Sequence, residues 1–168
     1  LTGGNETTTS SIAHGMWLLL RHPEQMKKVM ENNDLISKFI EETIRYETPV
    51  QGLFRTATVD TEMRGVKIPK GSTLLVRYAA LNRDEDIFED PEIFNVERKD
   101  VGKHLAFGSG AHHCIGASLA RAEMLAAFKH FFDRIDGIEL AKDLPDIPHQ
   151  PSIFLHQLKE LHIKFRKR

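Results

Sequence analysis

The stretch Phe107–Gly116, FGSGAHHCIG, holds the only cysteine of the chain, Cys114. An alanine-rich helical pattern follows directly, so Cys114 lies just before a predicted helix N-terminus. Unpaired N–H groups and the helix dipole favour negative charge there, which favours a thiolate. Glycines without a Cβ let the backbone approach a flat, bulky group closely. A thiolate beneath a planar macrocycle is the pattern of haem ligation.

Three other interpretations of Cys114 stay open on the residues alone. It could be a buried small hydrophobe, which is common for a lone cysteine. It could bind zinc, but His112, His113 and Cys114 are consecutive and no second cysteine completes a tetrahedral site. It could be the nucleophile of a Cys–His hydrolase with either histidine as base, although the chain carries no other hydrolase signature.

Composition narrows the class of protein. The chain has 168 residues and a formal net charge of −1, which gives no electrostatic case for binding nucleic acid or an anionic membrane. Its longest apolar run, residues 16–20, is too short to span a bilayer. A single cysteine cannot form an internal disulfide, which favours a reducing, cytoplasmic setting. No linker or repeat interrupts the chain, so we expect residues 1–168 to form one unit.

The elements that must position Cys114 follow from hydrophobic periodicity, which predicts a mostly helical α+β fold. Helices are expected at residues 8–20, 23–32, 34–46, 78–82 and 117–133. Strands are expected at residues 54–59, 66–68, 73–76, 135–140, 153–156 and 161–165. Asp34 is a good N-cap for its helix. The polar stretch 83–103 has no clear period, and such a long irregular loop is often functional.

The cysteine loop matches every fixed position of the haem-binding loop of the cytochrome P450 family, namely Phe, Gly, any, Gly, any, His or Arg, any, Cys, any, Gly. The chain therefore resembles the C-terminal portion of a bacterial cytochrome P450, and we expect it to be part of a longer protein. The resemblance implies haem b with Cys114 as axial ligand. It also implies monooxygenation of an apolar small molecule with dioxygen, with electrons from a ferredoxin- or flavodoxin-type donor.

Two further motifs carry the same resemblance. Glu42 and Arg45 match the family's Glu-x-x-Arg helix, and the resemblance implies that they lock onto Arg98 in the irregular loop, with Asn95 where the family often has Asp. The stretch Gly3–Thr8, GGNETT, resembles the oxygen-activating part of the long helix over the haem. There Glu6 would relay protons and Thr7 would hydrogen-bond dioxygen.

The resemblance also assigns residues to the cofactor, the substrate and the electron donor. Arg55 and His112 would bind haem propionates, and the loop would contact haem through Phe107, Gly108, Gly110 and Gly116. The substrate pocket would be lined by Gly3, Val50, Leu53, Phe54, Ile153 and Phe154. Arg121 would either attract an acidic donor or pair with Glu123 or another nearby acid.

A second hypothesis for the function belongs to a different class of protein. The chain could be a non-catalytic fragment or interaction module that folds without making a complete haem pocket. A carbon monoxide difference spectrum separates the two interpretations, because thiolate-ligated haem gives a red-shifted band.

Overall fold

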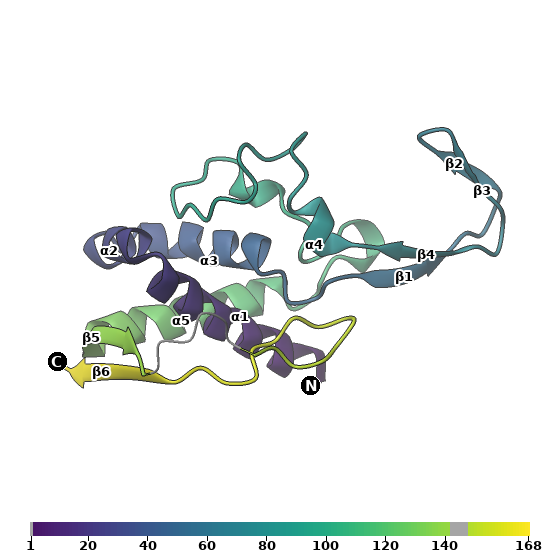
Figure 1. Ribbon diagram of the computed structural model, residues 1–168. Helices are drawn as coiled ribbons and strands as arrows, with labels where there is room; N and C mark the ends of the chain where they lie inside the picture. The colour runs from purple at the N-terminus through teal and green to yellow at the C-terminus, as the bar shows by residue number, and fades with distance from the viewer. Residues whose placement is uncertain (1, 142–147) are drawn as a thin grey trace.

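Helices form the larger part of the regular secondary structure in the computed structural model, which describes residues 2–141 and 148–168. Helices α1 (Thr2–Arg21), α3 (Leu35–Tyr46) and α5 (Ala117–Arg134) pack against one another (Figure 1). The short α2 (Pro23–Glu31) connects α1 to α3, with its proline in the first turn as expected. Among the described residues, none of the helices has the length and apolarity needed to cross a bilayer.

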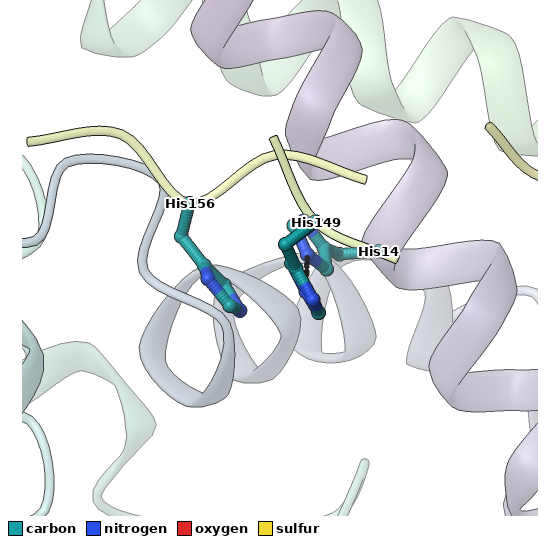
Figure 2. A group of neighbouring side chains, drawn as sticks. All are labelled: His14, His149 and His156. Carbon is teal, nitrogen blue, oxygen red and sulfur yellow. Dashed lines mark hydrogen bonds between the residues drawn. The ribbon is translucent and has the colours of Figure 1, made fainter. Parts of the chain in front are cut away.

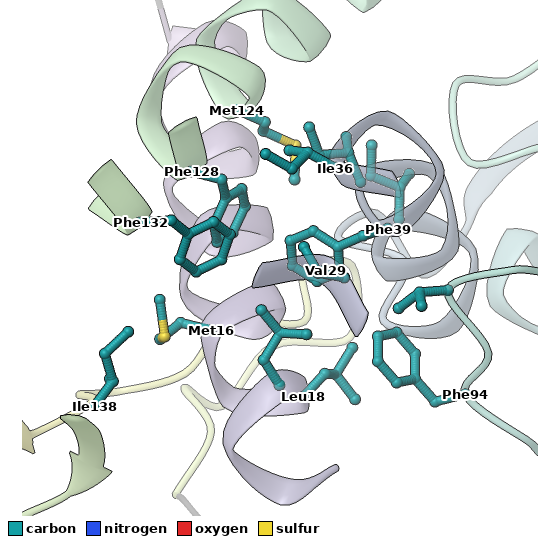
Figure 3. Close-up of a cluster of buried hydrophobic side chains, with 14 of the residues drawn as sticks. Met16, Leu18, Val29, Ile36, Phe39, Phe94, Met124, Phe128, Phe132 and Ile138 are labelled. Atoms are coloured by element: carbon teal, nitrogen blue, oxygen red, sulfur yellow. The ribbon is translucent and has the colours of Figure 1, made fainter. Parts of the chain in front are cut away.

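The hydrophobic core lies where α1, α3 and α5 meet (Figure 3). Phe39 of α3 and Phe128 of α5 pack edge to face with ring centroids 4.8 Å apart. Gly15 of α1 allows this contact, because a Cβ there would lie 2.7 Å from Cζ of Phe128 and 3.1 Å from Cζ of Phe39. The predicted apolar face of α3 is confirmed, since Ile36, Phe39, Ile40 and Ile44 are all buried.

The start of one predicted helix is wrong, and the predicted N-cap residue of another, Asp34, is in place but makes no side-chain cap bond. The first helix begins at Thr2, not at residue 8, so the glycines Gly3 and Gly4 are helical. Asp34 precedes α3, but its side chain caps no helical N–H; its own backbone N–H donates instead to Oδ1 of Asn32 at 3.0 Å. Asn32 therefore organises this turn by a local side-chain bond of the kind that competes with capping.

Four short strands form an arm that projects from the helices (Figure 1). β1 (Leu53–Thr56) pairs antiparallel with β4 (Thr73–Val76), and β2 (Thr61–Met63) pairs antiparallel with β3 (Val66–Ile68). The predicted strand over 54–59 therefore ends early. The chain bends after Thr56, where Asp60 Oδ1 accepts a hydrogen bond from the Lys70 N–H at 2.7 Å.

The C-terminal strands β5 (Ile135–Leu140) and β6 (Ile163–Lys167) also pair antiparallel. The predicted strand over 153–156 does not form, and a single bridge joins Val50 to Leu155. Ser152 explains this, because its Oγ accepts hydrogen bonds from the N–H groups of Phe154 and Leu155 at 3.2 and 3.0 Å. Those two amides are used in a local turn and are lost to a longer ladder.

The predicted irregular stretch is confirmed. After α4 (Tyr78–Leu81), the chain contains only two 3-10 turns before α5, η1 (Val101–Lys103) and η2 (Gly110–His112). Phe88, Phe94 and Val96 anchor it by burying their side chains. This stretch delivers the cysteine loop to the start of α5.

Candidate functional site

A buried ion-pair network holds the irregular stretch against α3. Arg45 donates to both carboxylate oxygens of Glu42, from Nε at 2.7 Å and from Nη2 at 2.9 Å. Arg98 donates from Nε to Oε1 of Glu42 at 3.1 Å. Glu42 and Arg45 are 0% exposed and Arg98 is 7% exposed, so these charges rely on one another. Asn95 also joins the network, because its backbone N–H donates to Oε1 of Glu42 at 3.0 Å.

Asn82 connects this network to the cysteine loop. Its carbonyl oxygen accepts a hydrogen bond from Nη1 of Arg45 at 2.9 Å. Its side-chain Oδ1 accepts a hydrogen bond from the Leu105 N–H at 2.7 Å. Asn82 is 0% exposed, and Leu105 stands two residues before the loop begins. One buried residue, Asn82, thus links Arg45 to the cysteine loop.

The cysteine loop folds back on itself. The Cys114 N–H donates to the carbonyl oxygen of Phe107 at 2.8 Å, and the His113 N–H donates to that of Gly110 at 3.0 Å. Gly108 and Gly110 have φ angles of 70° and 69°, in the left-handed region that favours glycine. The Cys114 carbonyl accepts from the Ala117 N–H at the start of α5. The side chain of Cys114 is exposed, so the interpretation as a buried hydrophobe is wrong.

Cys114 lies on the wall of a cavity of about 680 Å³ between α1 and the cysteine loop. The loop and α5 supply one side of the wall, with Phe107, Gly108, His112, Cys114, Gly116 and Leu119. The N-terminal part of α1 supplies another, with Gly3, Gly4, Glu6, Thr7, Thr8 and Ser11. Further lining residues are Val50, Leu53 and Arg55, which lie between α3 and α4, and Tyr78 at the start of α4. The cavity thus brings together two motifs that are more than a hundred residues apart.

Thr7 presents its hydroxyl group in a defined way. Oγ1 of Thr7 donates to the carbonyl oxygen of Gly3 at 3.0 Å, one helical turn earlier. The hydroxyl proton is therefore used in a hydrogen bond within α1. The lone pairs of Oγ1 can still accept a hydrogen bond from a group in the cavity. No atom lies within 4 Å of a Cβ built on Gly3 or Gly4, so this part of α1 leaves open space.

Comparison with known proteins identifies the protein family to which the chain belongs. The family model described as "Cytochrome P450" matches residues 1–165. The chain belongs to the cytochrome P450 family. Among curated relatives, it is 40% identical to Cytochrome P450 109 of Bacillus spizizenii over 164 residues, which are 98% of this chain and 40% of the relative. It is 34% identical to the Steroid C26-monooxygenase of Mycolicibacterium smegmatis over 165 residues, or 98% of this chain and 41% of that one.

Solved cytochrome P450 structures share the fold. The structure of P450BioI in complex with hexadec-9Z-enoic acid ligated acyl carrier protein superposes with a TM-score of 0.93 at 38% identity, over 98% of this chain and 42% of that one. A substrate-free cytochrome P450 of Mycobacterium marinum gives a TM-score of 0.95 at 35% identity, over 99% of this chain and 42% of that one. The α+β fold is thus that of part of a cytochrome P450, and the chain spans about two-fifths of the length of these relatives.

The residues around the cavity fit the haem group that the P450 family carries. The cavity has an exposed thiol on its wall, and one basic side chain, Arg55, with one histidine, His112, at the same cavity. Arg55 lies in β1, where Nη1 donates to the carbonyl oxygen of Phe54 at 2.8 Å and Nη2 to the hydroxyl of Tyr78 at 3.3 Å. Haem requires a ligand for its iron, polar partners for its propionate carboxylates and apolar surroundings. This cavity offers the sulfur of Cys114, the side chains of Arg55 and His112, and an apolar wall.

Arg121 has a partner in this P450 chain. Its Nε and Nη2 donate to the two carboxylate oxygens of Glu41 at 2.6 and 2.8 Å, and its guanidinium lies 4.5 Å from the ring centroid of Phe107. The partner comes from α3 and is not Glu123. Burial acts to raise the pKa of Glu41, but the hydrogen bonds and charges of Arg121 and His104 outweigh it and lower this pKa to about 2. The hydrogen bond to Glu41 raises the pKa of Arg121.

Some predicted pocket residues do not reach the cavity. Ile153 is 78% exposed and Phe54 is 51% exposed, and neither lines it; Phe154 and Leu155 do. Gly110 shapes the loop without lining the cavity. Phe54 instead packs edge to face on Phe154, with ring centroids 5.9 Å apart.

Sequence reasoning missed three contributors to this site. Tyr78 lines the cavity and holds Arg55, Glu41 orients Arg121, and Asn82 supports the loop. Each acts through a partner at least 23 residues away. A period-based analysis of single segments gives no signal for such contacts. Asn82 stands where the apolar stretch 78–81 gives way to the charged stretch 83–86, so its polar side chain is not conspicuous in the sequence.

Proposed function

We propose that this protein is a haem-thiolate monooxygenase that acts on an apolar small molecule. The observation that carries the proposal is the exposed thiol of Cys114 on the wall of a cavity that α1 closes with Glu6 and Thr7. When bound, haem activates dioxygen so that one oxygen atom enters the substrate and the other leaves as water, with electrons from a redox partner.

The chain's own residues divide the remaining tasks. Cys114 would supply the thiolate ligand, and Arg55 and His112 would bind the propionate carboxylates. Gly108 and Gly116, which carry no Cβ, would let the backbone approach the cofactor closely. Val50, Leu53 and Phe154 exclude water and offer apolar surface to the substrate, which supports an apolar substrate class. The relatives named above include proteins whose names refer to a steroid and to a fatty-acyl carrier, so the exact substrate is left open.

Protons reach the cavity by way of α1 in this proposal. Glu6 is exposed on α1 and also lines the cavity, so its carboxylate can exchange protons with solvent. Thr7 follows it with oxygen lone pairs turned away from the Gly3 carbonyl, ready to accept a hydrogen bond from water or another protonated oxygen. The pair holds and passes protons, and haem supplies the redox chemistry.

The decisive experiment is a carbon monoxide difference spectrum of the reduced protein, produced from its complete gene. Thiolate-ligated haem shows the red-shifted band that the family is named for. A protein that purifies without pigment, or whose band is not red-shifted, would reject the proposal in favour of the non-catalytic interaction module.

Substitution of Thr7 by alanine is expected to uncouple the reaction. Electrons should still be consumed, but most should appear in hydrogen peroxide, because the oxygen that positions protons in the cavity is lost. The measurement is product formed per nicotinamide cofactor oxidised, together with peroxide released. Thr9→Ala is the matched control, since Thr9 is an exposed residue of α1 that does not line the cavity. Equal coupling in both variants would reduce Thr7 to a helix residue.

The Arg121–Glu41 pair offers a test of electron delivery. We expect an acidic donor protein to dock near the cysteine loop, and the 39%-exposed Arg121 side chain carries the attracting charge. Arg121→Gln should slow the first electron transfer several-fold at low salt, and Glu41→Gln, which leaves Arg121 uncompensated, should accelerate it. Both differences should shrink as salt rises. If both variants are slower at every salt concentration, the pair is structural and does not steer the donor.

A further inference from the structure

Three histidine side chains that are far apart in the sequence stack together away from the cavity (Figure 2). His14 comes from α1 and is 0% exposed, whereas His149 and His156 come from the chain after β5. The ring centroids of His149 and His156 are 4.1 Å apart, and those of His14 and His156 are 4.9 Å apart. One nitrogen from each ring lies within 4.8 Å of those of the other two.

The hydrogen bonds of His14 fix which of its nitrogens carries a lone pair. Nδ1 lies 3.0 Å from the carbonyl oxygen of Ser10 and 3.2 Å from Oγ of Ser10. A carbonyl oxygen can only accept, so Nδ1 carries the proton and Nε2 is left unprotonated. Nε2 faces Nε2 of His149 at 3.5 Å.

His156 is oriented by a carboxylate. Its Nε2 lies 2.8 Å from Oε2 of Glu47, which follows α3. An Nε2–H donated to Glu47 leaves the lone pair on Nδ1 of His156. Ser10 holds the same segment, because its Oγ donates to the carbonyl oxygen of His156 at 2.7 Å. A metal-binding histidine whose other nitrogen donates to a carboxylate or a backbone carbonyl is the usual arrangement around metal ions, and both His14 and His156 have it.

His149, the third histidine of the group, lies on a chain segment that pairs with the segment carrying His156. His149 forms a bridge with Leu158, and the Gln150 N–H donates to the carbonyl oxygen of Gln157 at 2.9 Å, so residues 148–159 fold back on themselves. This pairing carries His149 beside His156 on two adjacent segments. His149 is exposed, which gives an ion in solution access to the group.

We propose that His14, His149 and His156 form a binding site for a divalent transition-metal ion, with Zn²⁺ as the ion we commit to. Three imidazole nitrogens suit zinc, and an exposed edge leaves room for water as a fourth ligand. Zinc–nitrogen bonds of about 2.0 Å place the ligands of a tetrahedron roughly 3.4 Å apart. The nitrogens, now within 4.8 Å of one another, would therefore approach by up to about 1.4 Å, and the stacked rings would turn so that their lone pairs meet at one point. The exposed His149 would make the largest part of this movement.

A metal ion at this position would fasten three parts of the fold. It would join α1 to both segments of the 148–159 turn, and through Glu47 to the end of α3. Ser11, the residue after Ser10, lines the cavity. Leu155, the residue before His156, also lines it. The metal site would thus stiffen the wall of the cavity from behind, independently of whether haem is bound.

The test is zinc binding by the protein made from its complete gene, without added affinity-tag histidines and after treatment with a chelator. We expect one equivalent of Zn²⁺ to bind per chain, to raise the melting temperature, and to be replaced by Co²⁺ with the visible absorption of a tetrahedral site. His149→Ala should lower zinc affinity at least tenfold with little effect on folding, because this side chain is exposed. His162→Ala is the matched control, since His162 is an exposed histidine outside the group, and it pairs with Glu160.

Two results would overturn the proposal. The first is the absence of a stoichiometric zinc ion in the unaltered protein. The second is unchanged zinc affinity in His149→Ala, above all if Cys114→Ala removes the binding instead, because zinc would then lie at the cysteine loop. Cys114→Ala with full zinc binding, alongside loss in His149→Ala, supports the site at the three histidines.

Discussion

Replacing Cys114 with alanine should abolish thiolate ligation of haem and with it all monooxygenase activity. Cys114 is the only cysteine in the chain, and its side chain is exposed at the cavity. This chain holds no other thiolate that could take over, so the red-shifted carbon monoxide band should disappear completely. The loop itself should keep its shape, since the hydrogen bond from residue 114 to Phe107 comes from the backbone N–H.

Two companion variants make this prediction sharp. Cys114→His replaces sulfur by an imidazole nitrogen, so we expect haem to be retained with a band that is not red-shifted. His113→Ala is the control, because it changes the neighbouring exposed side chain, which does not line the cavity. A Cys114→Ala protein with an unchanged spectrum would show that the thiolate ligand is not in this chain.

Replacing Arg45 with alanine should prevent stable folding around haem, although Arg45 does not line the cavity. The change removes both hydrogen bonds to Glu42 and leaves the carbonyl oxygens of Asn82 and Pro91 without their donor. Breaking a buried ion pair by removing one partner costs about 3–5 kcal/mol, which is a large share of the stability of a typical domain. We expect low haem content and a clearly lower melting temperature.

The comparison variants separate this buried network from ordinary ion pairs. Arg45→Lys should be almost as damaging, because a single ammonium group cannot reach both oxygens of Glu42 and the carbonyl groups of Asn82 and Pro91 together. Lys27→Ala is the control, since its contact with Glu31 at 3.8 Å is exposed and such pairs contribute little. Normal haem content and melting temperature in Arg45→Ala would mean that the network is dispensable.

The candidate site was partly visible in the sequence because its parts are local motifs. FGSGAHHCIG places a thiol, two glycines with positive φ and a helix start within ten residues, so loop chemistry and helix propensity act on neighbours. Glu42 and Arg45 are three residues apart on one helical turn, and their contact follows from helix geometry. The buried face of α3 is equally a matter of local periodicity.

Other features depended on contacts that no local pattern encodes. The pairing of Arg121 with Glu41 joins residues 80 apart, and it exists only because α5 packs on α3. Leu155 lines the cavity and the predicted Ile153 does not, in a segment where Ser152 accepts hydrogen bonds from two amides that a strand would have used. Tyr78 also depends on such a contact, because it reaches Arg55 only where β4 pairs with β1 and leads into α4.

By itself, the sequence determined the helices, the irregular stretch before the cysteine loop, and the identity of the thiol at the cavity, because these depend on periodicity, turn residues and side-chain type within short segments. Only the tertiary structure decided that His14, His149 and His156 stand together. Their separation of 135 residues along the chain means that their distance depends on how α1 and the C-terminal segment pack. Packing of this kind is set by the whole core, where Gly15, Phe39 and Phe128 fix the spacing of the helices.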